Sequence, residues 1–195
     1  MILLLDSSST QLSVALSDGT AVVNKKSYYA WQSQSELMVP EIVNLLKETG
    51  SSFKSLKAVA VSIGPGSYTG VRIALTIAKM IGYSLRIPVY AGSSLQMLRN
   101  GDHPTICLIN ARSGRSYFGV YQGSTALVPD SILSNEEVLA YIKQHPDYKL
   151  GGALEYLNLP SHDVDIFANL LDLTKSIKPI SDIHALKPVY LKDHL

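Results

Sequence analysis

The chain opens with hydrophobic patterns that are typical of strands. Residues 1–5 form a continuous apolar run typical of a buried strand, and residues 12–16 alternate as a second strand. Asp18-Gly19 is a tight-turn pair that predicts a hairpin, with a third strand over residues 20–27. The chain is therefore predicted to begin with three sequential strands.

The period then changes to that of a helix. Apolar residues recur at helical spacing over residues 37–47, and Gly50 supplies a stop. Pro40 lies inside this segment, so we expect the regular part of the helix to begin near it.

A strand–helix–strand unit follows. Residues 58–62 read as a buried strand, and a glycine-rich turn leads into a helix over residues 69–85. Apolar side chains cover most of the circumference of that helix, so it needs partners on more than one side. A short strand at residues 89–91 and a helix near residues 94–99 complete this half.

Residues 100–104 are polar and rich in turn formers, and they mark a boundary. Beyond them a similar order begins again, with strands at 105–109, 116–121 and 126–128, a helix at 136–143, a strand at 148–150 and a helix at 165–174. The repetition is one of element order only. It predicts a double α/β protein with a cleft between a first half, residues 1–102, and a smaller second half, residues 103–195. We expect residues 184–195 to pack back on the first half.

Composition narrows the class of protein. Hydrophobic residues make up 46% of the 195 residues and charged residues 17%, as in a folded globular chain. The net charge is only +1, and no run of basic residues is longer than Lys25-Lys26. Such a chain offers few positive charges for binding the phosphates of a nucleic acid. The single cysteine, Cys107, excludes an internal disulfide and reads as a buried strand thiol. No apolar stretch approaches the roughly 20 residues that span a bilayer, so we expect a cytoplasmic protein.

The stretch Gly64-Pro-Gly-Ser-Tyr-Thr-Gly70 is the most informative motif. It follows a predicted strand and opens a predicted helix, where glycines let backbone N–H groups face an anion. The spacing matches neither a dinucleotide fingerprint nor a P-loop. Candidate phosphate-facing residues are Gly64, Gly66, Ser67 and Thr69. The alternative is a tight strand-to-helix turn with Ser67 or Thr69 as its N-cap.

Two further turns carry candidate chemistry. Asp6 and Ser7 close the first strand, and an acid followed by hydroxyls suits a magnesium-bound phosphate as well as it suits a plain turn. Asn110 and Arg112 occupy the equivalent turn of the second half. An amide at position 110 can neither act as a general base nor supply charge to a metal, which counts against catalysis. The five histidines are scattered without helical spacing, so we predict no metal site.

These motifs together resemble the TsaB (YeaZ) family. Residues 64–73 are similar to the family hallmark GPGSFTGLRIG, with Tyr68 for its Phe and Val71 for its Leu. Supporting matches lie along nearly the whole chain, at residues 5–8, 35–40, 93–95, 110–114 with Tyr117, and 187–192. The family usually has acidic residues where Asn110 and Arg115 stand here.

The resemblance implies a fold and a role. The fold would be that of the actin/sugar-kinase/Hsp70 superfamily, with two RNase H-like halves. The role would be a non-catalytic one in the transfer of threonylcarbamoyl to the tRNA adenosine beside the anticodon, together with the catalytic paralogue TsaD and the ATPase TsaE. It implies no intrinsic cofactor, ATP or ADP bound in the complex with TsaD and TsaE, and contact with tRNA only through the complex. Whether the isolated chain binds a nucleotide is left open by the sequence. TsaD proteins carry a metal-binding histidine pair whose positions fall here at Ser94 and Leu98, which cannot hold a transition metal.

The resemblance also implies an interaction surface on the two helices at residues 37–47 and 69–85, which pair with their counterparts in TsaD. The strongly apolar character of both helices supports it. Candidate interface residues are Leu37, Leu45, Arg72, Ile73, Ile77, Met80 and Ile81, with Ile77 taken as an outward position. Without TsaD, we expect a two-fold homodimer. Two other functions compete: a small-molecule kinase of the same superfamily, which the missing carboxylate at position 110 disfavours, and a metallopeptidase, which the missing histidine pair disfavours.

Overall fold

The first half is built on a five-stranded sheet. A computed structural model describes residues 1–160 and 164–191, and its first sheet has the strand order β3-β2-β1-β4-β5. The strands are β1 (Ile2–Asp6), β2 (Gln11–Ser17), β3 (Val22–Tyr29), β4 (Ala58–Ser62) and β5 (Val89–Gly92). β1 pairs antiparallel with β2 and parallel with β4. The predicted Asp18-Gly19 turn joins β2 to β3, with the Asp18 carboxylate accepting the N–H groups of Thr20 and Ala21.

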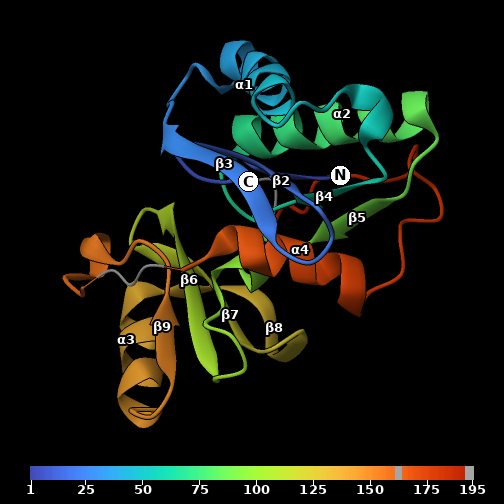
Figure 1. The fold of residues 1–195 in the computed structure, drawn as a ribbon. Helices are drawn as coiled ribbons and strands as arrows, with labels where there is room; N and C mark the ends of the chain where they lie inside the picture. Colours follow the sequence, from blue (N-terminus) through green and yellow to red (C-terminus); the bar gives the residue numbers. More distant parts are fainter. Residues whose placement is uncertain (161–163, 192–195) are drawn as a thin grey trace.

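Helices cover both faces of this sheet (Figure 1). α1 (Gln34–Glu48) and α2 (Tyr68–Leu85) pack on one face, and α4 (Ile166–Ser176) packs on the other. Leu3, Leu4 and Leu5 of β1 are all completely buried, because successive side chains of a strand point to opposite faces and both faces are covered. This explains why the chain opens with a continuous apolar run.

The expected start of α1 near Pro40 is wrong. The helix begins at Gln34, with Pro40 inside it. The side-chain amide of Gln34 is buried and donates to the carbonyl oxygens of Ser9 and Gln11, at 3.0 and 3.3 Å. Met38 is completely buried against the sheet. These tertiary contacts hold the first turns in place in spite of the proline.

The second half has a four-stranded sheet of order β8-β7-β6-β9. Its elements are β6 (Thr105–Arg112), β7 (Arg115–Gln122), β8 (Thr125–Ser134), α3 (Asn135–Gln144) and β9 (Lys149–Gly151). β8 is longer than the three residues expected, and it accommodates Pro129 because it is an edge strand. Ser134 and Glu137 form a capping box that starts α3, as the acidic first turn suggested.

α4 follows the second sheet in sequence but packs on the first. Phe167, Leu170 and Leu171 join Leu4 and Ala15 in one buried cluster. The side-chain amide of Asn169 also donates to the carbonyl oxygens of Met97 and Arg99. α4 therefore covers the second apolar face of the first sheet, opposite to α1 and α2, although it follows the strands of the second half in the sequence.

The helix expected near residues 94–99 is a single 3₁₀ turn, Gln96–Leu98. The Ser94 hydroxyl accepts the N–H of Gly64 at 3.0 Å, and the Arg99 guanidinium donates to the carbonyl oxygen of Gln96. Both polar side chains are buried. Side-chain contacts with the rest of the fold therefore stop the helix after one turn. Two further 3₁₀ turns lie at Phe53–Ser55 and Glu155–Leu157.

The chain ends in an extended segment that we call the C-terminal strap, residues 177–191. It returns to the first half, where the N–H of Ile180 donates to the carbonyl oxygen of Val89 at 2.8 Å. The Lys79 ammonium of α2 donates to the strap carbonyls of His184 and Leu186, at 3.0 and 2.9 Å. The strap thus runs along α2. Residues 192–195 of the expected return segment lie outside the described residues.

Candidate functional site

The turn after β1 and the loop before α2 lie together at one edge of the first sheet. β1 and β4 are parallel neighbours, so their carboxyl ends meet there. The N–H of Ser67 donates to the carbonyl oxygen of Ser8 at 2.7 Å, and the Ser7 hydroxyl donates to the carbonyl oxygen of Gly70 at 2.6 Å. The two motifs singled out in the first half therefore form one packed unit.

The three glycines of the loop each receive a main-chain carbonyl oxygen of this chain. A Cβ on Gly64 would lie 2.5 Å from the oxygen of Val189, and one on Gly66 would lie 2.3 Å from that of Ser8. On Gly70 it would lie 1.9 Å from the oxygen of Ser7. No Cβ tolerates such distances, so the glycines allow close approach of the chain to itself.

Of the two readings of this loop, the geometry favours the tight strand-to-helix turn. Ser67 is the N-cap of α2, and its hydroxyl accepts the N–H of Gly70 at 3.3 Å. Thr69 and Tyr68 are exposed in the first turn, while Gly64 is buried. The N–H groups of Gly64, Ser67 and Gly70 already donate to oxygen atoms of this chain, whereas an anion cradle needs N–H groups that are free to face the ligand.

Asp6 is buried at the same edge, with 6% of its surface exposed. Its Oδ1 accepts the hydroxyls of Ser8, at 2.8 Å, and of Ser62. Burial raises the pKa of the Asp6 carboxyl, and the hydrogen bonds from Ser62 and Ser8 only partly oppose that rise. Magnesium is bound by accessible, ionised carboxylates, so this buried and hydroxyl-bonded group is poorly placed for such a role.

Asn110 and Arg112 lie in the hairpin between β6 and β7. The Asn110 side-chain oxygen accepts the N–H of Arg112 at 2.7 Å, which closes the turn locally. The Arg112 guanidinium lies 5.9 Å from the centre of the Trp31 ring, which follows β3 in the first half. Both residues are exposed. The structure thus gives Arg112 a cation–π contact between the halves.

The positions that correspond to the TsaD histidines belong to the scaffold. Ser94 and Gly64 exchange two hydrogen bonds, from the Gly64 N–H to the Ser94 hydroxyl and from the Ser94 N–H to the Gly64 carbonyl. Leu98 is partly buried against the second sheet. Within residues 1–160 and 164–191, no three His, Cys, Asp or Glu side chains cluster as metal ligands would. His162 and His194 lie outside those residues.

The structure divides the predicted interface residues into three groups. Leu45, Ile77 and Ile81 belong to the core between the helices and the sheet, so the choice of Ile77 as an outward position is wrong. An apolar residue on a helix that is apolar nearly all round cannot be assigned to a face from sequence. Arg72 and Met80 do point outward, and Leu37 and Ile73 are partly buried. The exposed row on α2 consists of Arg72, Thr76, Met80 and Tyr83.

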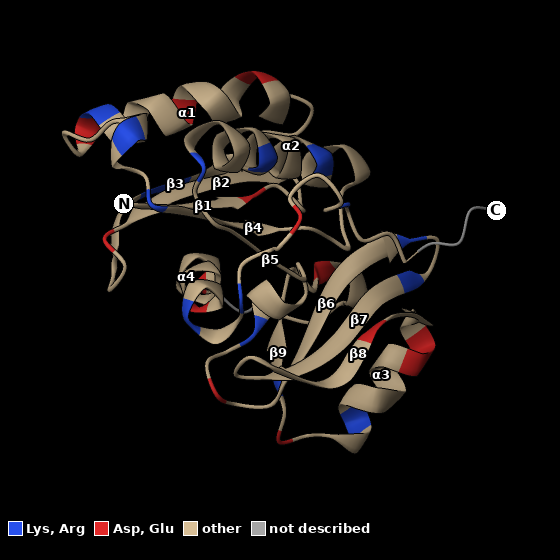
Figure 2. Cartoon of the chain, turned by 90° about the vertical axis from the view of Figure 1, so that its right-hand side faces the viewer, with Lys and Arg blue, Asp and Glu red and all other residues tan. Residues whose placement is uncertain are grey.

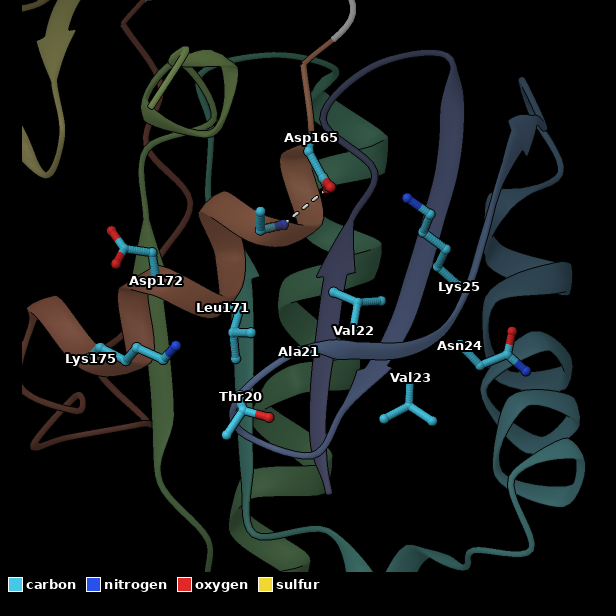
Figure 3. A pocket seen from close by; sticks show the side chains of 11 residues that line it. Thr20, Ala21, Val22, Val23, Asn24, Lys25, Asp165, Leu171, Asp172 and Lys175 are labelled. Atoms are coloured by element: carbon cyan, nitrogen blue, oxygen red, sulfur yellow. Dashed lines mark hydrogen bonds between the residues drawn. The ribbon is translucent and has the colours of Figure 1, made fainter. Parts of the chain in front are cut away.

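A hollow of about 650 Å³ lies elsewhere, between the β2–β3 turn and α4 (Figure 3). It is lined on one side by residues 20–25 and on the other by Asp165, Ala168, Leu171, Asp172 and Lys175. The Asp165 carboxylate caps α4, as the dashed line in Figure 3 shows, and Asp172 pairs with Arg99. None of the predicted site residues lines it.

Comparisons with known proteins agree with one another. The family model of TsaD, described as tRNA N6-adenosine threonylcarbamoyltransferase, matches residues 29–176. The tRNA threonylcarbamoyladenosine biosynthesis protein TsaB of Bacillus subtilis is 31% identical over 215 residues, which cover 98% of this chain and 93% of that protein. TsaB of Escherichia coli is 31% identical over 149 residues, or 73% of this chain and 62% of that protein. The solved structure of YeaZ from Pseudomonas aeruginosa is 24% identical with a TM-score of 0.78, covering 97% of this chain and 99% of that one.

Two mixed sheets with the repeated order of elements, together with these likenesses, define a two-lobed protein with RNase H-like halves, of the actin/sugar-kinase/Hsp70 class. The fold predicted from the sequence is therefore confirmed. The chain belongs to the TsaB (YeaZ) family.

Proposed function

We propose that this chain acts in tRNA threonylcarbamoyladenosine biosynthesis as a non-catalytic subunit. Its partners would be a TsaD-like catalytic subunit, which transfers threonylcarbamoyl to the adenosine next to the anticodon, and a TsaE-like ATPase. The observation that carries the proposal is the packed glycine loop. The chain's own carbonyl oxygens from Ser7, Ser8 and Val189 fill the space beside the three glycines.

The chemistry of the neighbouring side chains supports the same proposal. Asp6 is the acidic residue that the sequence predicted at this edge of the sheet. It is buried and accepts hydrogen bonds from two hydroxyl groups, and burial raises the pKa of its carboxyl. Asn110 supplies an amide where a two-lobed phosphotransferase would need a second carboxylate. Of the two acids that the kinase alternative would use, one is therefore replaced by an amide and the other is buried behind two hydroxyl groups. ATP or ADP would be bound in the complex with the TsaD-like and TsaE-like subunits.

The partner surface would be the outer side of α1 and α2. Met80 and Tyr83 are 60% and 64% exposed on α2, and Val39 is 41% exposed on α1. Large apolar side chains grouped on two adjacent helices are typical of a surface that another protein covers. A TsaD-like subunit would cover it in the complex, and a second copy of this chain would cover it in a two-fold homodimer.

Charge supports an indirect contact with tRNA. Lys and Arg lie on elements of both halves, with Asp and Glu among them (Figure 2). The net charge of +1 offers few phosphate contacts, so tRNA would be held mainly by the partners. Such a complex would work in the cytoplasm. Among the described residues, no helix is long and apolar enough to cross a bilayer.

Reconstitution tests the proposal. The chain is incubated with tRNA, threonine, bicarbonate, ATP and an enzyme that forms threonylcarbamoyl-adenylate, with or without the TsaD-like and TsaE-like proteins of the same genome. We expect threonylcarbamoyladenosine only when all partners are present, and loss of the product when this chain is left out. Product formed by this chain without the TsaD-like protein would overturn the non-catalytic assignment, and full activity without this chain would overturn the role itself.

A further inference from the structure

The C-terminal strap is joined to the glycine loop by its main chain. The N–H of Val189 donates to the carbonyl oxygen of Ile63 at 2.7 Å, and the carbonyl oxygen of Val189 lies in the space left open by Gly64. Because Gly64 has φ +103°, a glycine is needed there twice over, for its backbone conformation and for this contact. The strap is thus seated in the loop that starts α2.

Aromatic pairs border the exposed row of α2 at both ends. The Tyr190 ring of the strap stacks on the Tyr68 ring with centroids 4.8 Å apart and planes at 23°. At the other end, Tyr83 meets His184 of the strap edge to face at 5.1 Å. Tyr68 and Tyr190 are 56% and 41% exposed, so the stack buries only part of each ring. The strap therefore adds aromatic surface beside the helix.

Arg72 joins this aromatic surface to the helix row. Its guanidinium donates to the Tyr68 hydroxyl at 2.8 Å and lies 5.2 Å from the centre of the same ring. In the part of the chain that the structure describes, no carboxylate forms an ion pair with Arg72. An exposed arginine held by an aromatic ring is a common anchor at protein interfaces.

We infer that the strap is an integral part of the docking surface for a second copy of this chain. The surface combines the exposed row of α2 with Tyr68 and Tyr190, and it is complete only while the strap is seated. The inference rests on the homodimer in the proposed function.

A second copy supplies the complementary charge. Glu36 is exposed in the first turn of α1, and Arg72 is exposed in the second turn of α2. Both helices begin at the same edge of the sheet, because β3 and β4 both end there. A two-fold contact that sets the first turns of α1 and α2 of the two copies against each other would pair each Arg72 with a Glu36 of the other copy.

Sedimentation equilibrium of the full chain tests this. We compare the wild type with Tyr190→Ala, which removes the stacked ring, and Val189→Pro, which removes the N–H that seats the strap. Tyr29→Ala is the matched control, because Tyr29 is an exposed tyrosine on the edge strand β3. Met80→Glu reports on the helix row alone. Circular dichroism confirms that each variant is folded.

We expect both strap variants and Met80→Glu to weaken dimerisation about tenfold or more, as loss of an aromatic anchor does, with Tyr29→Ala unchanged. If Met80→Glu weakens the dimer while both strap variants keep the wild-type dissociation constant, the role of the strap is overturned and the helix surface stands. If Met80→Glu also leaves the dimer unchanged, or the wild type is a monomer at every concentration, the proposed homodimer surface itself is overturned.

Discussion

The carbonyl oxygen of Val189 lies only 2.5 Å from the position that a Cβ on Gly64 would take. The two residues are far apart in sequence, and their contact ties the end of the described chain to the start of α2. Gly66 and Gly70 make the same kind of contact with Ser8 and Ser7. A loop whose glycines resemble an anion cradle thus serves as the point where three segments of the chain meet.

We expect Gly64→Ala to lower the free energy of unfolding by about 2 kcal/mol or more, because the methyl group meets the Val189 carbonyl and the φ of +103° is strained for alanine. Urea unfolding followed by circular dichroism measures the change. Gly101→Ala is the control, since Gly101 has φ +55° with no atom within 4 Å of an added Cβ. A loss no larger than the control's would show that the strap yields freely.

Asp6→Asn is expected to change how stability depends on pH. Burial raises the folded-state pKa of Asp6, so between the ordinary aspartate pKa and that raised value the folded state holds more protons than the unfolded state. Stability therefore falls as pH rises through this window, and an asparagine, which does not titrate, removes that fall. Thermal unfolding of both proteins across the acidic and neutral range measures it.

Asp18 supplies a comparison of opposite sign. The N–H of Ala21 and the hydroxyl and N–H of Thr20 lower the pKa of Asp18 to about 2, so its contribution is complete above its ordinary pKa and is lost as pH falls through about 2. In Asp18→Asn we expect the deficit in melting temperature to grow with pH across that window. If the difference in melting temperature from the wild type changed with pH in the same direction for both aspartate variants, the burial of Asp6 would be contradicted.

Ile77→Glu and Met80→Glu should separate core from surface on α2. Ile77 is 8% exposed and Met80 is 60% exposed. A carboxylate at position 77 is left without water or a partner, so we expect a loss of about 3 kcal/mol or more, against about 0.5 kcal/mol at position 80. Urea unfolding of both variants checks this. Equal losses would show that the orientation of α2 is not as described.

We expect the ion pair between Asp172 and the buried guanidinium of Arg99 to stabilise the packing of α4. The Arg99 Nη2 lies 2.6 Å from the Asp172 carboxylate, and the Arg99 side chain is only 3% exposed while that of Asp172 is 42% exposed. Since Asp172 is partly screened by water, we expect Asp172→Ala to cost about 1–2 kcal/mol.

A double-mutant cycle in urea isolates this pair. Replacing Arg99 by methionine removes the charge that Asp172→Ala leaves unpaired, so we expect the double variant to lose less than the sum of the two single variants. Strict additivity would mean that the ion pair does not hold α4 against the turn before β6.

Local patterns in the sequence determined most of the elements. Residues 1–5 and 58–62 had to be strands because continuous apolar runs of that length are buried on both faces, and Asp18-Gly19 had to be a turn because its own side chain and φ favour one. The repeated order of elements likewise specified two halves. The hallmark around Gly64 was enough to place the chain in its family.

Tertiary structure alone decided what those elements face. The apolar stripe of α4 does not say which sheet it will cover, and the periodicity of α2 could not distinguish buried Ile77 from exposed Met80. The sequence of the glycine loop could not predict that the Val189 carbonyl lies beside Gly64, because that contact joins residues more than a hundred positions apart. Such contacts depend on the packing of the whole chain, since burial and close approach belong to pairs of segments and to no single one.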